Sequence, residues 1–367
     1  MNNDIGLEIA SPGPACIGTG LMALDVVING DHKVPPRLWA GGSFGNVMII
    51  LSSFGWRSFP VARLGRDAAA EKIVAELAKF GVVLDFVQRD EKASTPIIIE
   101  QIKKAADGTV SHRFFRICPD CGRWLPGYRA ILLQVARSLK DQVPDAEVFY
   151  FDRAAPGTLE LARTARSRGA LIVFEPPGIK DEKLFRQAVQ LSHIVKYSKE
   201  NIEDLVEPAL EVRPLLIVQT MGGRGMRFKL RRANNTRSEW KAIDAYGVKH
   251  LKDAAGAGDW CTAGIIHSLG RGGALQLENM AEDELIEALR FGQALAALNC
   301  CFEGARGGMY ILSKTELENE IDKIMSRKWA ECPIASKDIM RDIRDEGEAL
   351  HRDICNLYGE DRIGSRF

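Results

Sequence analysis

The chain has 367 residues, of which 46% are hydrophobic and 27% are charged, a composition typical of a globular protein with one large or two smaller domains. Lysine plus arginine and aspartate plus glutamate each number 49, so the formal net charge is 0 and no global basicity points to nucleic acid or to an anionic membrane. The longest apolar runs are too short to cross a bilayer, and the N-terminus does not have the pattern of a signal peptide. We therefore expect a cytoplasmic protein whose partners are small molecules and whose eight cysteines are reduced.

The first element that the sequence predicts is a strand over residues 15–28, an apolar run interrupted by Gly18 and Gly20. Asp25 follows these glycines, at the expected end of the strand, where ligands collect in open α/β sheets. A solvated aspartate at a strand end is the simpler alternative, and the local residues do not decide between the two.

A glycine-containing loop and a buried helix over residues 47–55 come next. Gly41 and Gly42 would let a ligand approach the backbone closely, and the amide of Asn46 has both a donor and an acceptor for hydroxyl groups. Asn46 could instead cap the helix. A short strand at 58–64 and an amphipathic helix at 68–80 follow.

Residues 96–117 interrupt the alternation of strands and helices. Two extended runs flank Asp107-Gly108, a pair typical of a tight hairpin turn, so we expect a β-hairpin that forms a separate flap. Cys118 and Cys121 after it make one C-x-x-C pair. No second pair stands at a suitable spacing, so the sequence does not favour a zinc site.

The alternation returns from about residue 128. We expect helices at 128–140, 157–168 and 181–191, and strands at 147–152, 170–175, 193–197 and 215–219. The strands are short apolar runs without alternation, as expected for a parallel sheet that helices cover on both faces. The predicted fold class is therefore α/β, a three-layer α/β/α sandwich with a mostly parallel central sheet and a small β lid.

A second glycine-rich turn, Thr220 to Gly225, follows the strand at 215–219. Its backbone could lie flat against a planar ligand, or it could simply be a hairpin turn into the strand at 226–230. A strand at 237–245 and helices near 282–303 and 315–326 complete the domain. Residues 334–358 are charge-rich with apolar positions at helical spacing, which predicts an amphipathic helix.

The stretch from Asp253 to Asp259 is the strongest candidate for chemistry. Small residues stand between two aspartates, and an apolar run follows that predicts a helix beginning there. The free N–H groups of a first helical turn favour a phosphate, and Asp259 beside them could accept a proton from an attacking hydroxyl. Asp259 could equally be a capping residue without catalytic function.

Taken in this order, the motifs resemble those of the ribokinase-like, or PfkB, family of carbohydrate kinases. The resemblance rests on residues 41–46 with Gly65-Arg66-Asp67 downstream, on residues 220–225 and on residues 253–259, and it covers roughly residues 13–328. It implies a kinase domain at 13–328, a lid from about 28–38 and 96–117, and a C-terminal helical extension at 329–367. A homodimer through the lid is one arrangement that the exposed edges of lid strands would allow.

The resemblance also implies roles for residues at matching positions. Asp259 would be the catalytic base, and the N–H groups of Gly256, Ala257 and Gly258 would form the anion hole. Substrate hydroxyls would be held by Asp25, Gly41, Gly42 and Asn46, and the nucleotide by Thr220, Gly222, Gly225 and Asn299. The implied cofactors are ATP and Mg²⁺, with a monovalent cation beside the anion hole in many relatives.

This chain departs from the family pattern at several positions. Ala254 stands where the family has threonine, and Trp260 where it usually has a small residue. The family's Asn-x-x-Glu element falls on residues 198–201, where neither end matches, and Glu200 is the candidate metal ligand from the neighbouring position. The leading hypothesis is an ATP-dependent kinase for a hydroxyl of a small sugar or sugar derivative.

Two alternatives remain open. One is a nucleoside kinase of the same fold, with Phe44, Phe115 and Trp124 as candidate stacking groups for a base. The other is a catalytically impaired homologue that still binds sugar and nucleotide.

Overall fold

The computed structural model describes residues 13–29, 36–104, 110–118, 122–202, 214–231 and 237–327. The strands are β1 (Ala15–Thr19), β2 (Ala23–Asn29), β3 (Arg37–Gly41), β4 (Arg57–Pro60), β5 (Ala62–Leu64), β6 (Val87–Arg89), β7 (Ile97–Lys104), β8 (Val110–Phe115), β9 (Val148–Phe151), β10 (Leu171–Phe174), β11 (Ile194–Ser198), β12 (Leu216–Thr220), β13 (Met226–Leu230) and β14 (Lys241–Ile243). The helices are α1 (Ser43–Ser53), α2 (Ala68–Lys79), α3 (Leu133–Leu139), α4 (Pro156–Ser167), α5 (Glu182–Leu191), the 3₁₀ turn η1 (Gly222–Arg224), α7 (Ala257–Leu269), α8 (Gly273–Asn279), α9 (Glu282–Asn299), α10 (Gly307–Ile311) and α11 (Lys314–Met325).

An eight-stranded sheet forms the centre of the molecule, in the order β14-β13-β12-β11-β10-β9-β1-β4. Neighbouring strands run parallel from β12 to β4, whereas β13 and β14 pair antiparallel at one edge. Along β9, Val148 and Tyr150 belong to one hydrophobic cluster, while Phe149 and Phe151 belong to another. Both faces of the sheet are therefore buried, which explains the continuous apolar strands and confirms the predicted sandwich.

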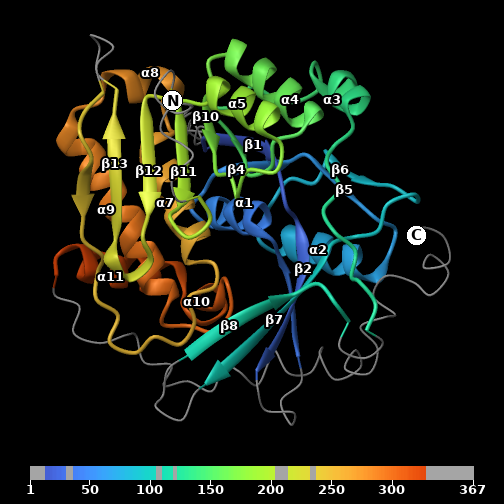
Figure 1. Ribbon diagram of the computed structural model, residues 1–367, viewed down its shortest axis with the longest axis horizontal. Helices are drawn as coiled ribbons and strands as arrows, with labels where there is room; N and C mark the ends of the chain where they lie inside the picture. Colours follow the sequence, from blue (N-terminus) through green and yellow to red (C-terminus); the bar gives the residue numbers. More distant parts are fainter. Residues whose placement is uncertain are drawn as a thin grey trace, which may run out of the picture.

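Helices form the two outer layers (Figure 1). On one face α7 packs between α1 and α9, and on the other α4 packs between α3 and α5. Helix α5 buries Phe185, Ala188 and Val189, whose spacing places them on one side of the helix. Helix α7 is buried nearly all around because the sheet and two helices surround it, so its sequence shows no polar face.

A second sheet, which we call the lid, has the order β3-β2-β7-β8 and lies apart from the central sheet (Figure 1). Strands β7 and β8 are the predicted hairpin, with Lys104 opposite Val110 at its end, and the predicted turn at 107–108 lies outside the described residues. The lid is larger than predicted from 28–38 and 96–117, because it also includes residues 23–27 and 39–41.

The predicted single strand at 15–28 is wrong, because it is two strands in two sheets. Strand β1 belongs to the central sheet and β2 to the lid. The chain turns between them at Gly20, where a Cβ atom would lie 2.0 Å from Oδ1 of Asp152. Asp25 therefore lies inside β2, opposite Trp39 and Ile98, and not at the end of a central strand.

Other boundaries also differ from those predicted. The segment 58–64 is divided between β4 and β5, and the helix expected at 128–140 begins only after the extended backbone of Leu132. Helices α8 and α10 were not predicted, and each begins at a glycine. The extension 329–367, with the helix expected at 334–358, lies outside the described residues.

Two findings concern membrane-spanning helices and the redox state of the cysteines. None of the described helices is long and apolar enough to cross a membrane. Cys16, Cys118, Cys261 and Cys300 are free thiols, whereas Cys301 is in a disulfide, so the expectation that every cysteine is reduced is wrong at that position.

Candidate active site

The N-terminus of α7 is the centre of the candidate site. Gly256 precedes the helix with a φ angle of 71°, and a Cβ atom there would lie 2.3 Å from the carbonyl oxygen of Ala305, so this position requires glycine. The N–H of Ala257 makes a hydrogen bond of 3.2 Å to Ala254. The N–H of the exposed Gly258 has no partner among the described residues. Such an N–H group, at the positive end of the helix dipole, favours an anion.

Asp259 lies in this first turn and is partly exposed. Its Oδ2 accepts a hydrogen bond of 2.7 Å from Nδ2 of Asn46, which comes from α1 and is 3% exposed. The other end of the amide, Oδ1 of Asn46, accepts a hydrogen bond of 2.9 Å from Nε of Arg306. Since arginine can only donate, this contact fixes the Asn46 amide with its nitrogen toward Asp259.

Burial raises the pKa of Asp259 well above its ordinary value, and the negative charge of Glu175 raises it further. The hydrogen bond from Asn46 and the ammonium group of Lys196 act in the opposite direction. A carboxylate with a raised pKa is a better proton acceptor near neutral pH. The environment therefore suits Asp259 for general-base catalysis.

Glu175, directly after β10, lies with Lys196 of β11 beneath the first turn of α7. Nζ of Lys196 donates to Oε1 of Glu175 and, at 3.2 Å, to the carbonyl oxygen of Gly258. The hydroxyl of Thr262 lies 2.6 Å from Oε2 of Glu175 and 3.0 Å from the Gly258 carbonyl, and its single proton is available to either acceptor. The hydroxyl of Tyr150 donates to the same Oε2 at 3.0 Å. A buried ion pair thus supports the carbonyl group just before Asp259.

Asp152 follows β9 in the same way that Glu175 follows β10. Its carboxylate accepts hydrogen bonds from the N–H of Leu21 at 2.9 Å and the hydroxyl of Ser43 at 2.5 Å, and Arg153 lies 3.0 Å away. These contacts fix the turn between β1 and β2 and the start of α1. Asp152 therefore joins the central sheet to the segment that carries Asn46.

The residues predicted to bind substrate meet where the lid approaches α1. Oδ2 of Asp25 lies 3.4 Å from the backbone nitrogen of Gly42, and a Cβ atom at Gly41 would lie 1.8 Å from the same oxygen. Burial raises the pKa of Asp25 to about 7, and the Gly42 N–H and the positive charge of Arg306 oppose this rise. Asp25, Gly41, Gly42 and Asn46 therefore share one region of the structure.

Arg306, between α9 and α10, encloses this region and is 1% exposed. Its guanidinium group forms an ion pair of 2.7 Å with Glu76 of α2 and donates to the carbonyl oxygen of Ala40. Phe80 and Tyr310 lie on either side at cation–π distances of 5.7 and 5.9 Å. Its position in the glycine-rich segment 304–308 gave no sequence signal for this role.

Asp253, at the start of the loop, contacts the lid. Its two carboxylate oxygens accept hydrogen bonds from the N–H groups of Ala255 at 2.9 Å and Gly304 at 2.8 Å. Glu100 of β7 shares a side-chain hydrogen bond with Asp253. Burial, followed by the charges of Asp253 and Asp25, raises the pKa of Glu100, so it is the protonated partner of this pair. The sequence reasoning missed Glu100 because it lies in an otherwise ordinary hairpin strand.

Of the residues predicted to bind nucleotide, two are accessible and two are buried. Thr220 ends β12, and Gly222 begins the exposed turn η1 beside it. Gly225 is buried instead, where a Cβ atom would lie 2.2 Å from the carbonyl oxygen of Ile243. Asn299 is also buried and donates at 2.7 Å to the carbonyl oxygen of Ala255, so it supports the loop from below.

Glu200, predicted as a metal ligand, is exposed in the turn after β11. The preceding residue, Lys199, donates its N–H to the carbonyl oxygen of Thr220 at 2.9 Å, so Glu200 lies near the end of β12. Across the described ranges, no group of three or more His, Cys, Asp or Glu could hold a metal ion.

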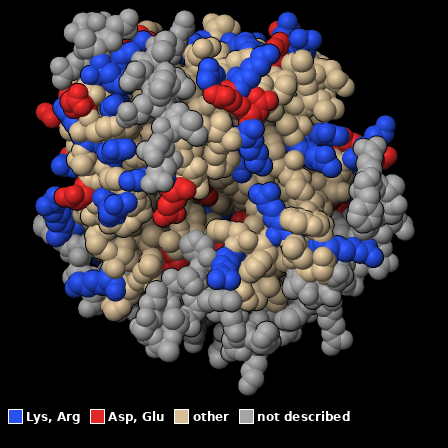
Figure 2. Space-filling model, in the orientation of Figure 1, with Lys and Arg blue, Asp and Glu red and all other residues tan. Residues whose placement is uncertain are grey.

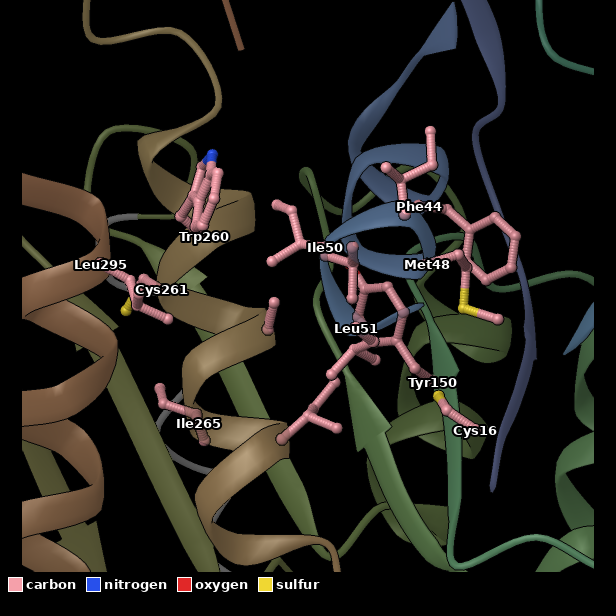
Figure 3. Packing of buried hydrophobic residues seen from close by; sticks show 14 of the residues in the cluster. Cys16, Phe44, Met48, Ile50, Leu51, Tyr150, Trp260, Cys261, Ile265 and Leu295 are labelled. Carbon is pink, nitrogen blue, oxygen red and sulfur yellow. The ribbon is translucent and has the colours of Figure 1, made fainter. Parts of the chain in front are cut away.

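Two bulky aromatic residues turn out to be part of the core. Trp260 is 2% exposed, meets Phe54 edge to face and donates from Nε1 to the Ala305 carbonyl at 3.0 Å. Figure 3 shows it on α7 near Ile50 of α1, with Cys261 and Ile265 turned toward Leu295 of α9. Phe44 is fully buried and stacks on Tyr150 at 5.9 Å between ring centroids. Neither residue is therefore available to contact a substrate.

Comparisons with known proteins concern the family of the chain. A family model described as pfkB family carbohydrate kinase matches residues 141–310. An uncharacterized sugar kinase of Pyrococcus horikoshii is 26% identical over 299 residues, covering 79% of this chain and 91% of that protein. A fructokinase of Solanum tuberosum is 25% identical over 286 residues, covering 72% of this chain and 81% of the relative.

Solved structures share the fold. The crystal structure of fructokinase with bound ATP from Xylella fastidiosa superposes with a TM-score of 0.66 at 20% identity, covering 84% of this chain and 98% of the other. A nucleoside kinase of Burkholderia thailandensis in complex with inosine gives a TM-score of 0.61 at 15% identity, covering 85% and 98%. At these identities the likeness establishes the architecture and not the substrate.

Proposed function

Because the chain belongs to the pfkB family of carbohydrate kinases, we propose that it transfers a phosphoryl group from ATP to a hydroxyl of a small sugar or sugar derivative. The single observation that carries this proposal is the arrangement at the start of α7. Asp259, with a raised pKa, stands next to the unpartnered N–H of Gly258 and is held by Asn46. A base and an anion site thus lie side by side, as phosphoryl transfer to a hydroxyl requires.

In the proposed reaction Asp259 accepts the proton of the attacking hydroxyl. The N–H groups of Gly256, Ala257 and Gly258 stabilise the negative charge of the transferred group. Asp25 and Asn46, with the backbone of Gly41 and Gly42, orient the sugar hydroxyls. The lid carries Asp25 and covers this region, which favours the exclusion of water during transfer.

The residues at the ends of β11 and β12 fit a nucleotide. Thr220 and Gly222 are accessible there, and no Cβ atom would meet a neighbour at Gly222. We assign to Gly225 and Asn299 a supporting role, because both are buried. When bound with Mg²⁺, ATP supplies the phosphoryl group. The residues that would hold it are Thr220, Gly222 and the first turn of α7.

The described residues fit metal ions less well than they fit a nucleotide. Glu200 is the only carboxylate that we assign to Mg²⁺, so the ion would be held mainly by phosphate oxygens and water. For a monovalent cation we assign no ligands, because both oxygens of Asp253 already accept backbone N–H groups. No step of the proposed reaction depends on either ion's position.

A sugar fits the site better than a nucleoside. Of the aromatic residues considered for stacking a base, Phe44 is fully buried against Tyr150, whereas Phe115 and Trp124 are 37% and 76% exposed, and in the described part of the chain no hydrogen bond or ring contact joins either of them to Asp25, Asn46 or Asp259. The polar groups near Asp259 are the carboxyl and amide groups of Asp25 and Asn46, which suit hydroxyls.

The test is Asp259→Asn, assayed with Mg-ATP and a panel of sugars, sugar acids and nucleosides for ADP release. We expect the wild type to turn over a sugar, and the variant to lose about 10²–10⁴-fold in kcat while ATP binding is retained, because a general base is removed.

Two outcomes would contradict the proposal. Unchanged turnover in Asp259→Asn would exclude Asp259 as the base. ATP and sugar binding by calorimetry without any product in the wild type would instead identify a binding protein that has lost catalysis, and turnover of nucleosides alone would identify a nucleoside kinase.

A further inference from the structure

The ion pair of Glu175 and Lys196 lies beneath the first turn of α7, beside the proposed base, and Lys196 contacts that turn through the Gly258 carbonyl. Lys196 is 2% exposed, although it occurs in the middle of an otherwise apolar strand. Burying two charged groups costs several kcal/mol per ion, as an order of magnitude, unless the pair is fully hydrogen-bonded. Such a pair therefore lowers the stability of the core unless its hydrogen bonds compensate, and its position beneath α7 suggests a functional role.

The geometry places both charges directly under the loop. From the Cβ position of Gly258, both Nζ of Lys196 and Oε1 of Glu175 lie 4.0 Å away. Lys196 donates to the Gly258 carbonyl and Tyr150 donates to Glu175, while the hydroxyl of Thr262 lies within hydrogen-bond distance of both acceptors. Hydrogen bonds from Lys196, Thr262 and Tyr150 thus fix the Glu175 carboxylate beneath Gly258, the residue before Asp259.

We propose that Glu175 is a positioning residue that acts through Asp259: its carboxylate, paired with Lys196 beneath the first turn of α7, strengthens Asp259 as a proton acceptor. This inference rests on the proposed function, in which Asp259 is the base. Lys196 has a second effect. Its positive charge and its hydrogen bond to the Gly258 carbonyl favour binding of an anion at the first turn of α7.

Charged and polar groups face Asp259 from several elements. Asn46 from α1 donates to it, Asp152 and Tyr150 approach from β9, Glu175 from β10 and Lys196 from β11. Asp152 is occupied by Leu21, Ser43 and Arg153, and Arg306 lies beyond Asn46. Glu175 is the carboxylate with the largest effect on the pKa of Asp259, and Lys196 partly offsets it.

The experiment measures the protonation of Asp259 directly. Protein labelled with ¹³C at the aspartate carboxyl carbons is titrated by NMR, and the Asp259 signal is assigned by its loss in Asp259→Asn. In Glu175→Gln we expect the titration midpoint of Asp259 to fall by about one pH unit or more, since a like charge is removed at close range. In the double variant Glu175→Gln/Lys196→Met, whose pair is neutral, the midpoint should lie between that of the single variant and that of the wild type.

The controls separate charge from packing. Lys196→Arg keeps the charge and should leave the midpoint near the wild-type value. Asp90→Asn removes one partner of the ion pair with Arg63, which lies 2.6 Å away and outside the site, and should not move the midpoint. If Glu175→Gln does not fold, the double variant, which leaves no unpaired charge, still reports on the effect.

An Asp259 midpoint that is equal in the wild type and the double variant, or that rises in Glu175→Gln, would overturn the inference. The acid limb of the pH profile of kcat/KM should move in the same direction as the midpoint. If the wild type shows no turnover but the midpoints follow the expected order, the proposed function fails and the inference about Glu175 stands.

Discussion

Glu100 is a buried carboxyl group whose surroundings favour its protonated form. It is 2% exposed, it shares a hydrogen bond with Asp253, and burial together with the charges of Asp253 and Asp25 raises its pKa to about 9. In the unfolded chain the same group ionises near its ordinary value of 4.5. Between these values the folded state binds more protons than the unfolded state, so stability falls as the pH rises through this range.

We therefore predict that Glu100→Gln stabilises the protein at pH 8. Glutamine has nearly the same shape and can donate the same hydrogen bond, but it carries no ionisation penalty in the folded state. The free energy of unfolding, measured with urea, should exceed that of the wild type by roughly 4–5 kcal/mol at pH 8, because about 3.5 pH units of the shift lie below pH 8 and each corresponds to about 1.4 kcal/mol. At pH 4 the difference should vanish. A variant that is less stable than the wild type at pH 8 would mean that Glu100 is ionised in the folded protein.

Single residues were predictable from the sequence where the backbone itself forms the site. The loop 256–259 was found because its glycines and aspartate occur together before a helix, and the structure places them at the N-terminus of α7. Glu175 and Asp152 could have been found by the same reasoning, since each follows an apolar strand. Arg306 could not, because its contacts with Asn46 and Glu76 join segments 260 and 230 residues apart.

The start of α7 is the element on which the proposed chemistry depends, and Gly256 determines its conformation. Any side chain there must adopt a positive φ angle and would contact Ala305, which also accepts the bond from Trp260. We predict that Gly256→Ala lowers kcat by about 10²-fold or more, because a displacement of about 1 Å at the reacting groups has that effect.

Gly247→Ala is the matched control for this substitution, since a Cβ atom there meets nothing within 4 Å. Circular dichroism and thermal unfolding of both variants would distinguish a local displacement from unfolding. Kinase activity in Gly256→Ala equal to that in Gly247→Ala would mean that the loop tolerates a side chain and that its geometry does not limit the reaction.

Elements were predictable where the hydrophobic period is unambiguous. Helix α2 is found at 68–79 against an expected 68–80, and strands β9 to β12 agree within a residue or two. The errors occur where tertiary contacts divide a continuous apolar run. Residues 15–28 look like one strand, but the approach of Asp152 to Gly20 separates β1 from β2. No local pattern contains that contact.

At the scale of the whole molecule, charge is spread widely. In the view of Figure 2, lysine and arginine side chains are scattered among acidic and uncharged residues. Large exposed hydrophobic side chains are instead concentrated on the outer edge of the lid, at Phe114, Ile117 and Trp124, which are 58%, 43% and 76% exposed. Strand β8 is the last strand of that sheet among the described residues.

We propose that two copies of the chain associate through this edge, which would bury the three exposed side chains. Sedimentation velocity of the wild type at about 50 µM should then show a dimer, since a cluster of exposed aromatic residues at an edge is typical of an interface. The double substitution Phe114→Glu with Trp124→Glu should give a monomer, because two carboxylates would be brought into an apolar contact. Leu275→Glu, at a residue of α8 that is 71% exposed and far from the lid, should remain dimeric. A monomeric wild type, or a double variant that still dimerises, would assign the exposed edge to another role.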